Sequence, residues 1–288
     1  HLDERPLHKD HEINPDVLGH IFEKYINQKQ MGAYYTKEDV TRYICTNTII
    51  PRIIRKLKER CPATFDTEPA IWDLLGEDPG RYLFPFVTGP LGSESSIELA
   101  DRICDGVQPS QESEDVRPEF APLSDTPRVI GERRRRFYQI RDGMVDGRTQ
   151  AMPDLVRSNV DLRQFIQDVI EVCEAPDVLW NLWVVIAGDK ERGDNRDVND
   201  GISVLDPACG SGAFLFAALN ILEPLYEGCL DRMRVFLQEE SPDNEFQEIY
   251  ANFNKVLAEV AKHPNRRYFI LKSIVLNNLY GVDLMEEA

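Results

Sequence analysis

The feature that most constrains the fold is a short apolar run that leads into glycines, VLDPACGSGAFL at 204–215. Val204 and Leu205 are typical of a strand, the Gly-Ser-Gly at 210–212 predicts a turn, and an apolar helix is predicted to begin at Ala213. A strand, a glycine turn and a helix in this order present free backbone N–H groups and the positive end of a helix to a ligand. Because glycine has no Cβ, a ligand can also approach the backbone closely. The sequence therefore predicts a ligand site at this turn.

Other interpretations of the glycine turn can be compared with its sequence. A dinucleotide fingerprint requires a third glycine in G-x-G-x-x-G, and Leu215 stands at that position. A phosphate-binding loop requires a lysine after the glycines, which this turn lacks. A purely structural turn is the remaining alternative, but the D-P-A-C before the glycines and the A-F-L after them favour a ligand site.

Asp206 indicates which chemical groups the ligand carries. Its carboxylate stands at the end of the predicted strand and adds an acceptor for a cationic or hydroxyl-bearing group. S-adenosylmethionine carries an amine, a sulfonium and a ribose, so it suits this combination of glycines, helix N-terminus and carboxylate. Cys209 has no histidine near it in the sequence, so we expect it to be a small residue packed behind the turn rather than a nucleophile.

Composition limits the other classes of function. The six cysteines include no C-x-x-C pair, so we expect no metal site and no disulfide framework, and a cytoplasmic location is favoured. The polar N-terminus and the lack of a long apolar run predict neither a signal peptide nor a membrane partner. The net charge of −17 argues against the chain alone being a strong nucleic-acid binder. The four arginines at 133–136 could touch phosphate, but a solvated helix face or acidic neighbours are the favoured interpretation.

Periodic apolar residues predict helices in the first 60 residues. An amphipathic helix is predicted at 14–26, because Asn14 can cap it and Pro15 suits its first position. Thr36 is expected to cap a second helix, and Pro51 to begin or kink a third. The buried face of the second helix is expected to consist of Val40, Tyr43 and Ile44.

Later in the chain, residues 61–157 give few signals beyond a helix around the arginines, and a polar linker is predicted at 188–200. Pro224 is expected to kink or end the helix that follows the glycine turn. The other expected elements are helices at 162–173 and 176–186, a helical insertion at about 228–270 and a strand at 274–284. We expect three regions: an N-terminal helical region at 1–60, an acidic and mostly helical insertion at 61–200, and the start of an α/β domain at 201–288.

Three segments carry a resemblance to a known family. D-P-A-C-G-S-G-A-F-L at 206–215 resembles motif I of the adenine DNA methyltransferases of restriction–modification systems. G-A-Y-Y-T at 32–36 resembles the N-terminal S-adenosylmethionine motif of the gamma-class order, and N-N-L-Y-G-V-D at 277–283 resembles motif II. The stretches at 159–171 and 218–227 are similar to large methyltransferases of phage-exclusion (BREX-type) systems and to Type IIG-like enzymes.

This resemblance implies a fold and a set of cofactor contacts. The fold would be α/β: a mainly helical N-terminal region and insertion that lead into the start of an incomplete Rossmann-like (class I) methyltransferase domain. Asp283 would accept hydrogen bonds from the ribose hydroxyls of S-adenosylmethionine. Thr36 would lie where helix N–H groups meet the methionine carboxylate. The other residues expected to contact the cofactor are Tyr34, Tyr35, Asp206, Pro207, Ala208, Gly210, Gly212 and Leu284.

One departure from the family pattern concerns catalysis. Adenine methylation in this family uses an (N/D)-P-P-(Y/F) motif whose ring stacks on a flipped base, and this chain contains no Pro-Pro dipeptide. We therefore expect the catalytic residues, and the regions that contact double-stranded DNA, to lie beyond Ala288. The chain would be the N-terminal part of a longer enzyme and inactive alone. The alternatives are a methyltransferase acting on RNA, protein or a small molecule, and a non-catalytic interaction module whose acidic middle segment binds partners.

Overall fold

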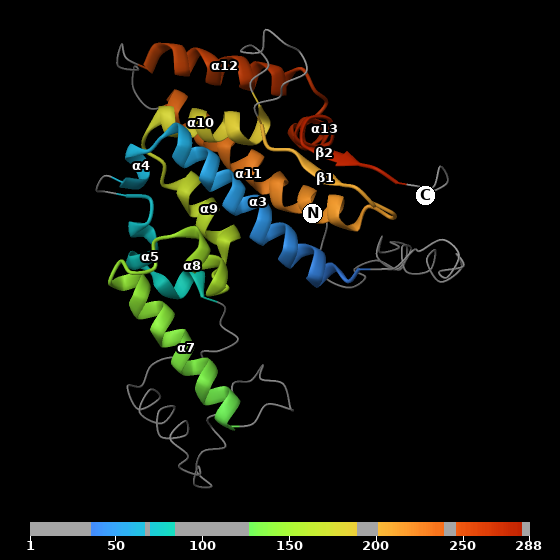
Figure 1. Ribbon diagram of the computed structural model, residues 1–288. Helices are drawn as coiled ribbons and strands as arrows, with labels where there is room; N and C mark the ends of the chain where they lie inside the picture. The colour runs from blue at the N-terminus through green and yellow to red at the C-terminus, as the bar shows by residue number, and fades with distance from the viewer. Residues whose placement is uncertain (1–35, 67–69, 84–126, 189–200, 239–245, 284–288) are drawn as a thin grey trace, which may run out of the picture.

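The computed structural model describes residues 36–66, 70–83, 127–188, 201–238 and 246–283, and of 127–131 and 134 it describes the backbone alone. Helices dominate these residues, and a small parallel sheet lies at one side (Figure 1). The larger helices are α3 (Glu38–Arg60), α7 (Pro127–Val145), α9 (Leu162–Glu171), α10 (Pro176–Ala187), α11 (Ala213–Gln238), α12 (Gln247–Ala261) and α13 (Arg266–Asn277). The shorter elements are α4 (Ala63–Asp66), α5 (Asp73–Glu77), η1 (Pro79–Tyr82), α8 (Met152–Arg157), β1 (Val204–Asp206) and β2 (Leu279–Gly281).

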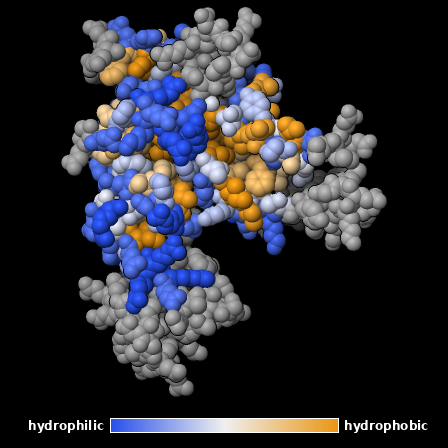
Figure 2. Space-filling view, viewed as in Figure 1, coloured by the Kyte–Doolittle hydropathy of each residue, from blue (hydrophilic) through white to orange (hydrophobic). Residues whose placement is uncertain are grey.

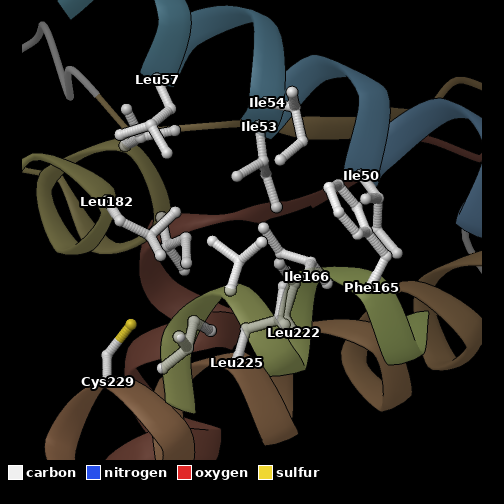
Figure 3. Packing of buried hydrophobic residues seen from close by; sticks show 14 of the residues in the cluster. Ile50, Ile53, Ile54, Leu57, Phe165, Ile166, Leu182, Leu222, Leu225 and Cys229 are labelled. Atoms are coloured by element: carbon white, nitrogen blue, oxygen red, sulfur yellow. The ribbon is translucent and has the colours of Figure 1, made fainter. Parts of the chain in front are cut away.

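Helix α11 is the centre of the packing. It contacts α3, α9, α10, α12 and α13, and buried side chains of α3, α9 and α10 point toward it in Figure 3. By length and composition alone α11 could cross a membrane, but here its apolar residues form the core of the helical assembly. The buried cluster includes residues from all three regions expected from the sequence. Removal of this apolar surface from water is the main force that holds the helices together.

Two prolines lie inside helices where the sequence predicted boundaries. Pro51 is inside α3, which is one helix of 23 residues, so the prediction that a new helix begins there is wrong. Pro224 is inside α11, so the prediction that it ends that helix is wrong as well. The missing N–H of Pro224 leaves the carbonyl of Asn220 without its intrahelical donor. Arg163 Nη2 donates to this carbonyl at 3.5 Å, so tertiary packing compensates for the proline.

The N-terminal half of α3 differs from the prediction in two respects. The helix begins at Glu38 and its N-cap position is Lys37 without a side-chain cap, so Thr36 does not cap it. Val40, Tyr43 and Ile44 are exposed by 46%, 53% and 42%, and the buried face starts instead with Thr41 and Cys45. The reason is the phase of the whole helix. Thr41, Cys45 and Ile49 continue the stripe of Ile53 and Leu57, and the exposed residues fall outside it.

The two strands are parallel, and Asp206 is the register partner of Gly281. Helices occupy the described residues between the strands, as the sequence predicted for the insertion. The strand predicted at 274–284 is mostly wrong, because α13 continues to Asn277 and β2 has only three residues. An apolar run such as this one fits either a helix or a strand. The helix is favoured here because three residues at helical spacing are buried together: Phe269, Ile270 and Ile274. The helices predicted at 162–173 and 176–186 are confirmed as α9 and α10.

Candidate functional site

The glycine turn joins β1 to α11 with two residues in the left-handed region. Gly210 has φ +46° and Gly212 has φ +79°, a conformation that side chains with a Cβ rarely adopt. An added Cβ at Gly210 would meet nothing within 4 Å, so the backbone conformation, not crowding, requires glycine there. The amide of Gly212 donates to the carbonyl of Cys209 at 2.7 Å, which closes the turn. The predicted strand, turn and helix are thus confirmed.

Backbone N–H groups at the start of α11 are directed toward the turn. The amide of Phe216 donates to the carbonyl of Gly212 at 2.9 Å, so the amides of Ala213, Phe214 and Leu215 belong to the first turn, which has no intrahelical acceptors. The preceding loop faces solvent, since Pro207, Ala208 and Gly210 are exposed. An anionic or hydroxyl-bearing ligand could therefore reach a helix N-terminus here.

Asp206 and Asp283 both bond to the turn. The Asp206 carboxylate accepts a hydrogen bond from the Ala208 amide at 3.1 Å, so one of its oxygens shapes its own loop. The Asp283 carboxylate accepts one from the Gly210 amide at 2.7 Å. The backbone extends this junction, because the Cys209 amide donates to the Val282 carbonyl at 3.0 Å. The tertiary structure thus brings together residues that the sequence predicted separately.

Cys209 and Gly281 pack against each other beneath the turn. An added Cβ at Gly281 would lie 3.1 Å from Cys209 Sγ and 3.0 Å from Leu215 Cδ1, closer than side chains normally pack. Glycine at 281 therefore allows β2 to approach the turn. The expectation that Cys209 is a small residue packed behind the turn is confirmed.

Asn278 holds the two strands in place and was given no role by the sequence. It is fully buried. Its Nδ2 donates to the carbonyls of Ile186 and Ile202 at 2.7 and 2.8 Å, and its Oδ1 accepts from the Tyr226 hydroxyl at 2.8 Å. Its own carbonyl accepts from the Val204 amide at 2.7 Å. The one signal in the sequence is a polar residue inside the apolar run IVLNNLYGV.

Helix α3 passes beside the turn. Cys45 Sγ donates to the Phe214 carbonyl at 3.5 Å. Burial raises the pKa of Cys45 to about 11, and the negative charge of Asp206 adds to the rise. In Figure 1 the beginning of α3 lies at the same end of the molecule as the beginning of α11. Thr36 is half-buried just before α3, whereas Tyr34, Tyr35 and Leu284 lie outside the described residues, as does the helix predicted at 14–26.

Exposed apolar side chains surround this end of the molecule. In Figure 2 they gather on the part of the visible face where α3 begins. Leu205 and Tyr280 are register partners on the exposed face of the sheet. Together with the residues on α3, the exposed apolar set near the turn includes Phe216 and Val282.

Comparison with known proteins gives one partial similarity. Over 54 residues the chain is 48% identical to a protein of Methanocaldococcus jannaschii named "Putative type II restriction enzyme and methyltransferase". The aligned segment covers 17% of this chain and 5% of that protein. No family model matches the chain, and no solved structure matches it. The similarity supports a relation to the methyltransferases of restriction–modification systems.

Proposed function

We propose that this chain is the cofactor-binding part of a DNA methyltransferase that transfers a methyl group from S-adenosylmethionine to the exocyclic amine of adenine. The observation that carries the proposal is the meeting of Asp206, the glycine turn and Asp283, although Gly210 and Asp283 are 73 residues apart. The name of the partial relative, a restriction enzyme and methyltransferase, favours DNA over RNA, protein or a small molecule as the substrate. The gamma class, with a Type IIG-like or phage-exclusion system as the setting, is the finer part of the proposal.

The described residues fit the polar groups of S-adenosylmethionine. The amides at the start of α11 suit the methionine carboxylate, which is an anion. The carboxylate of Asp283 suits the ribose hydroxyls, which would share it with the Gly210 amide or replace that amide. The parallel pair β1 and β2, connected by helices, would form the first two strands of a Rossmann-like sheet.

In this proposal the chain contributes positioning rather than acid–base chemistry. When bound, S-adenosylmethionine supplies an electrophilic methyl group on its sulfonium. The glycine turn would hold the amino-acid tail, and Asp283 would fix the ribose, so that the methyl group has one orientation. The base-holding (N/D)-P-P-(Y/F) motif is not in this chain, so these residues would contribute affinity and orientation only.

Calorimetry with S-adenosylmethionine tests the proposal. We expect Asp283→Ala to weaken binding by about tenfold to a hundredfold, the usual effect of removing hydrogen bonds to a charged acceptor. Asp146→Asn is the matched control, because Asp146 is an exposed carboxylate that pairs with Arg148 on a distant loop. Absence of S-adenosylmethionine binding by the wild-type chain would refute the proposal.

A further inference from the structure

The first half of helix α3 exposes a continuous apolar face. Val40, Tyr43 and Ile44 are all exposed, and Figure 2 shows apolar surface where α3 begins. At about 100° per residue, the three side chains together span about 100° of the helix, the width of the stripe that an amphipathic helix usually buries. Another side of the same half is already buried at Thr41 and Cys45. This half of α3 therefore has a second side suited to packing, which the described residues leave exposed.

The same face is buried in the second half of α3. Ile50 and Ile54 follow Tyr43 by seven and eleven residues, which are close to whole helical turns, so the three side chains lie on one line along the helix. Ile50 and Ile54 belong to the buried core, where α9 and α10 pack against α3. The described residues thus cover one end of this line, and Tyr43 marks the end that lacks a cover.

Residues 14–26 lie outside the described residues and have the sequence of a matching element. Six apolar residues of this segment form two adjacent rows with a spacing of four: Val17, Ile21 and Tyr25, and Leu18, Phe22 and Ile26. Such rows lie side by side on one face of a helix. A helix as short as this one is marginal in water, and its stability depends on packing of its apolar face. The segment therefore requires an apolar surface, just as α3 requires a cover.

The segment is also within reach of the exposed face. Residues 27–35 are all that separates it from Thr36, and a chain of this length spans up to about 30 Å. Ile44 lies only about 12 Å from Thr36 along the helix. Consecutive helices that are joined by short connections commonly pack against each other. Because the segment is tethered, its effective concentration at this face is high, which favours it over a second copy of the chain.

We propose that residues 14–26 pack as an amphipathic helix across Val40, Tyr43 and Ile44 of α3. This contact removes both apolar surfaces from water. It also holds residues 27–35 near the start of α11, since the Cys45 thiol of α3 donates to the Phe214 carbonyl at 3.5 Å. One consequence rests on the function proposed above: the docked segment positions the loop that resembles the S-adenosylmethionine motif, and so strengthens binding of that cofactor.

Limited proteolysis of the whole 288-residue chain tests the docking. Trypsin cuts after Lys24, and a docked helix must leave α3 before its backbone can be cut. We expect this bond to be cut about tenfold more slowly, or slower still, than in a synthetic peptide of residues 10–30. Tyr43→Gln removes an apolar contact and keeps a good helix former, so it should speed the cut by about threefold to tenfold. Val172→Gln is the matched control, because it changes an exposed apolar residue at the end of α9 and should have no effect.

A variant on the other side of the contact separates docking from loosening of α3. Phe22→Gln should also speed the cut at Lys24, each rate being divided by that of the peptide with the same sequence. If the two side chains are in contact, Tyr43→Gln/Phe22→Gln should speed the cut by less than the product of the single effects. Purely multiplicative effects would overturn the proposed contact.

Two further results would overturn the proposal. Equal cutting of the wild-type chain and the peptide would show that the segment is not docked, and protection that rises with protein concentration would assign the face to a second copy. Calorimetry with S-adenosylmethionine is a separate measurement on the same proteins. Protection of Lys24 without cofactor binding would refute the proposed function and leave the docking intact, whereas cofactor binding without protection would do the reverse.

Discussion

The carboxylate of Asp283 accepts a hydrogen bond of 2.7 Å from the backbone amide of Gly210, across 73 residues of sequence. This bond joins the end of β2 to the turn that follows β1, and it places an acidic side chain beside the N-terminus of α11. The candidate site therefore depends on how closely the two strands approach, and the residues that control this approach give the most direct tests.

Gly281→Ala should separate β2 from the glycine turn. The new Cβ would lie 3.1 Å from Cys209 Sγ, and we expect a loss of about 1–3 kcal/mol in the free energy of unfolding, measured by urea denaturation. Cys209→Ala in the same protein should restore part of this loss. Gly80→Ala is the control, since its nearest neighbour would be 3.4 Å away. Equal stability of Gly281→Ala and the wild type would contradict the close approach.

Asn278→Leu should destabilise the protein more than Tyr226→Phe. The leucine leaves the carbonyls of Ile186 and Ile202 and the Tyr226 hydroxyl without their partner, at about 1–3 kcal/mol for each buried group. Tyr226→Phe leaves only one buried group, Asn278 Oδ1, without its partner, at about 1–3 kcal/mol. In a double-mutant cycle of chemical denaturation, the effects should be non-additive. Purely additive losses would show that Asn278 and Tyr226 do not act as one network.

The Arg81–Asp168 ion pair should make stability depend on acid pH. Burial alone would raise the pKa of Asp168, but hydrogen bonds from Arg81, Gln164 and Tyr82 outweigh it and hold that pKa below its usual value. The stabilisation is therefore present above the unfolded-state pKa of about 3.9 and is lost as the pH falls through the lower folded-state pKa.

Asp168→Asn should remove this acid dependence and cost about 1.5–3 kcal/mol at pH 7. The free energy of unfolding, measured from pH 7 down to below pH 3, should fall more steeply for the wild type than for the variant. Asp142→Asn changes an exposed carboxylate in a surface pair and should leave the curve unchanged. Parallel curves for wild type and Asp168→Asn would contradict the assignment.

Asp206→Asn should make Cys45 easier to ionise. Burial and then the charge of Asp206 raise the pKa of this thiol to about 11, so only about one molecule in a thousand carries the thiolate at pH 8. Loss of the negative charge should lower the pKa of Cys45 and speed its labelling by iodoacetamide. The labelling rate is measured by mass spectrometry between pH 8 and 10. Cys61 also has a pKa of about 11, but Asp177 is its acidic neighbour, so its labelling should not change. Equal acceleration at both thiols would indicate general loosening instead.

Local chemistry alone was enough to predict several parts of this protein. The predictable parts are the glycine turn, the start of α11 at Ala213 and the amphipathic helices α9 and α10. They depend on neighbouring residues, because turn chemistry and apolar periodicity are properties of short segments. The helix boundaries predicted at two prolines were wrong for the opposite reason. Pro51 and Pro224 lie inside helices that pack against each other, and Arg163 of α9 reaches the carbonyl freed by Pro224.

The same distinction applies to the site. The sequence singled out Asp206, Gly210 and Gly212 by their local pattern, and it singled out Asp283 through the resemblance of 277–283 to motif II. Three features are visible only in the tertiary structure. The Asp283 carboxylate accepts from the Gly210 amide, and the Asn278 side chain makes three hydrogen bonds. The first apolar residues of α3, from Val40 to Ile44, are exposed to solvent. These features follow from which helix faces are buried against α11, and burial depends on contacts between segments far apart in the chain.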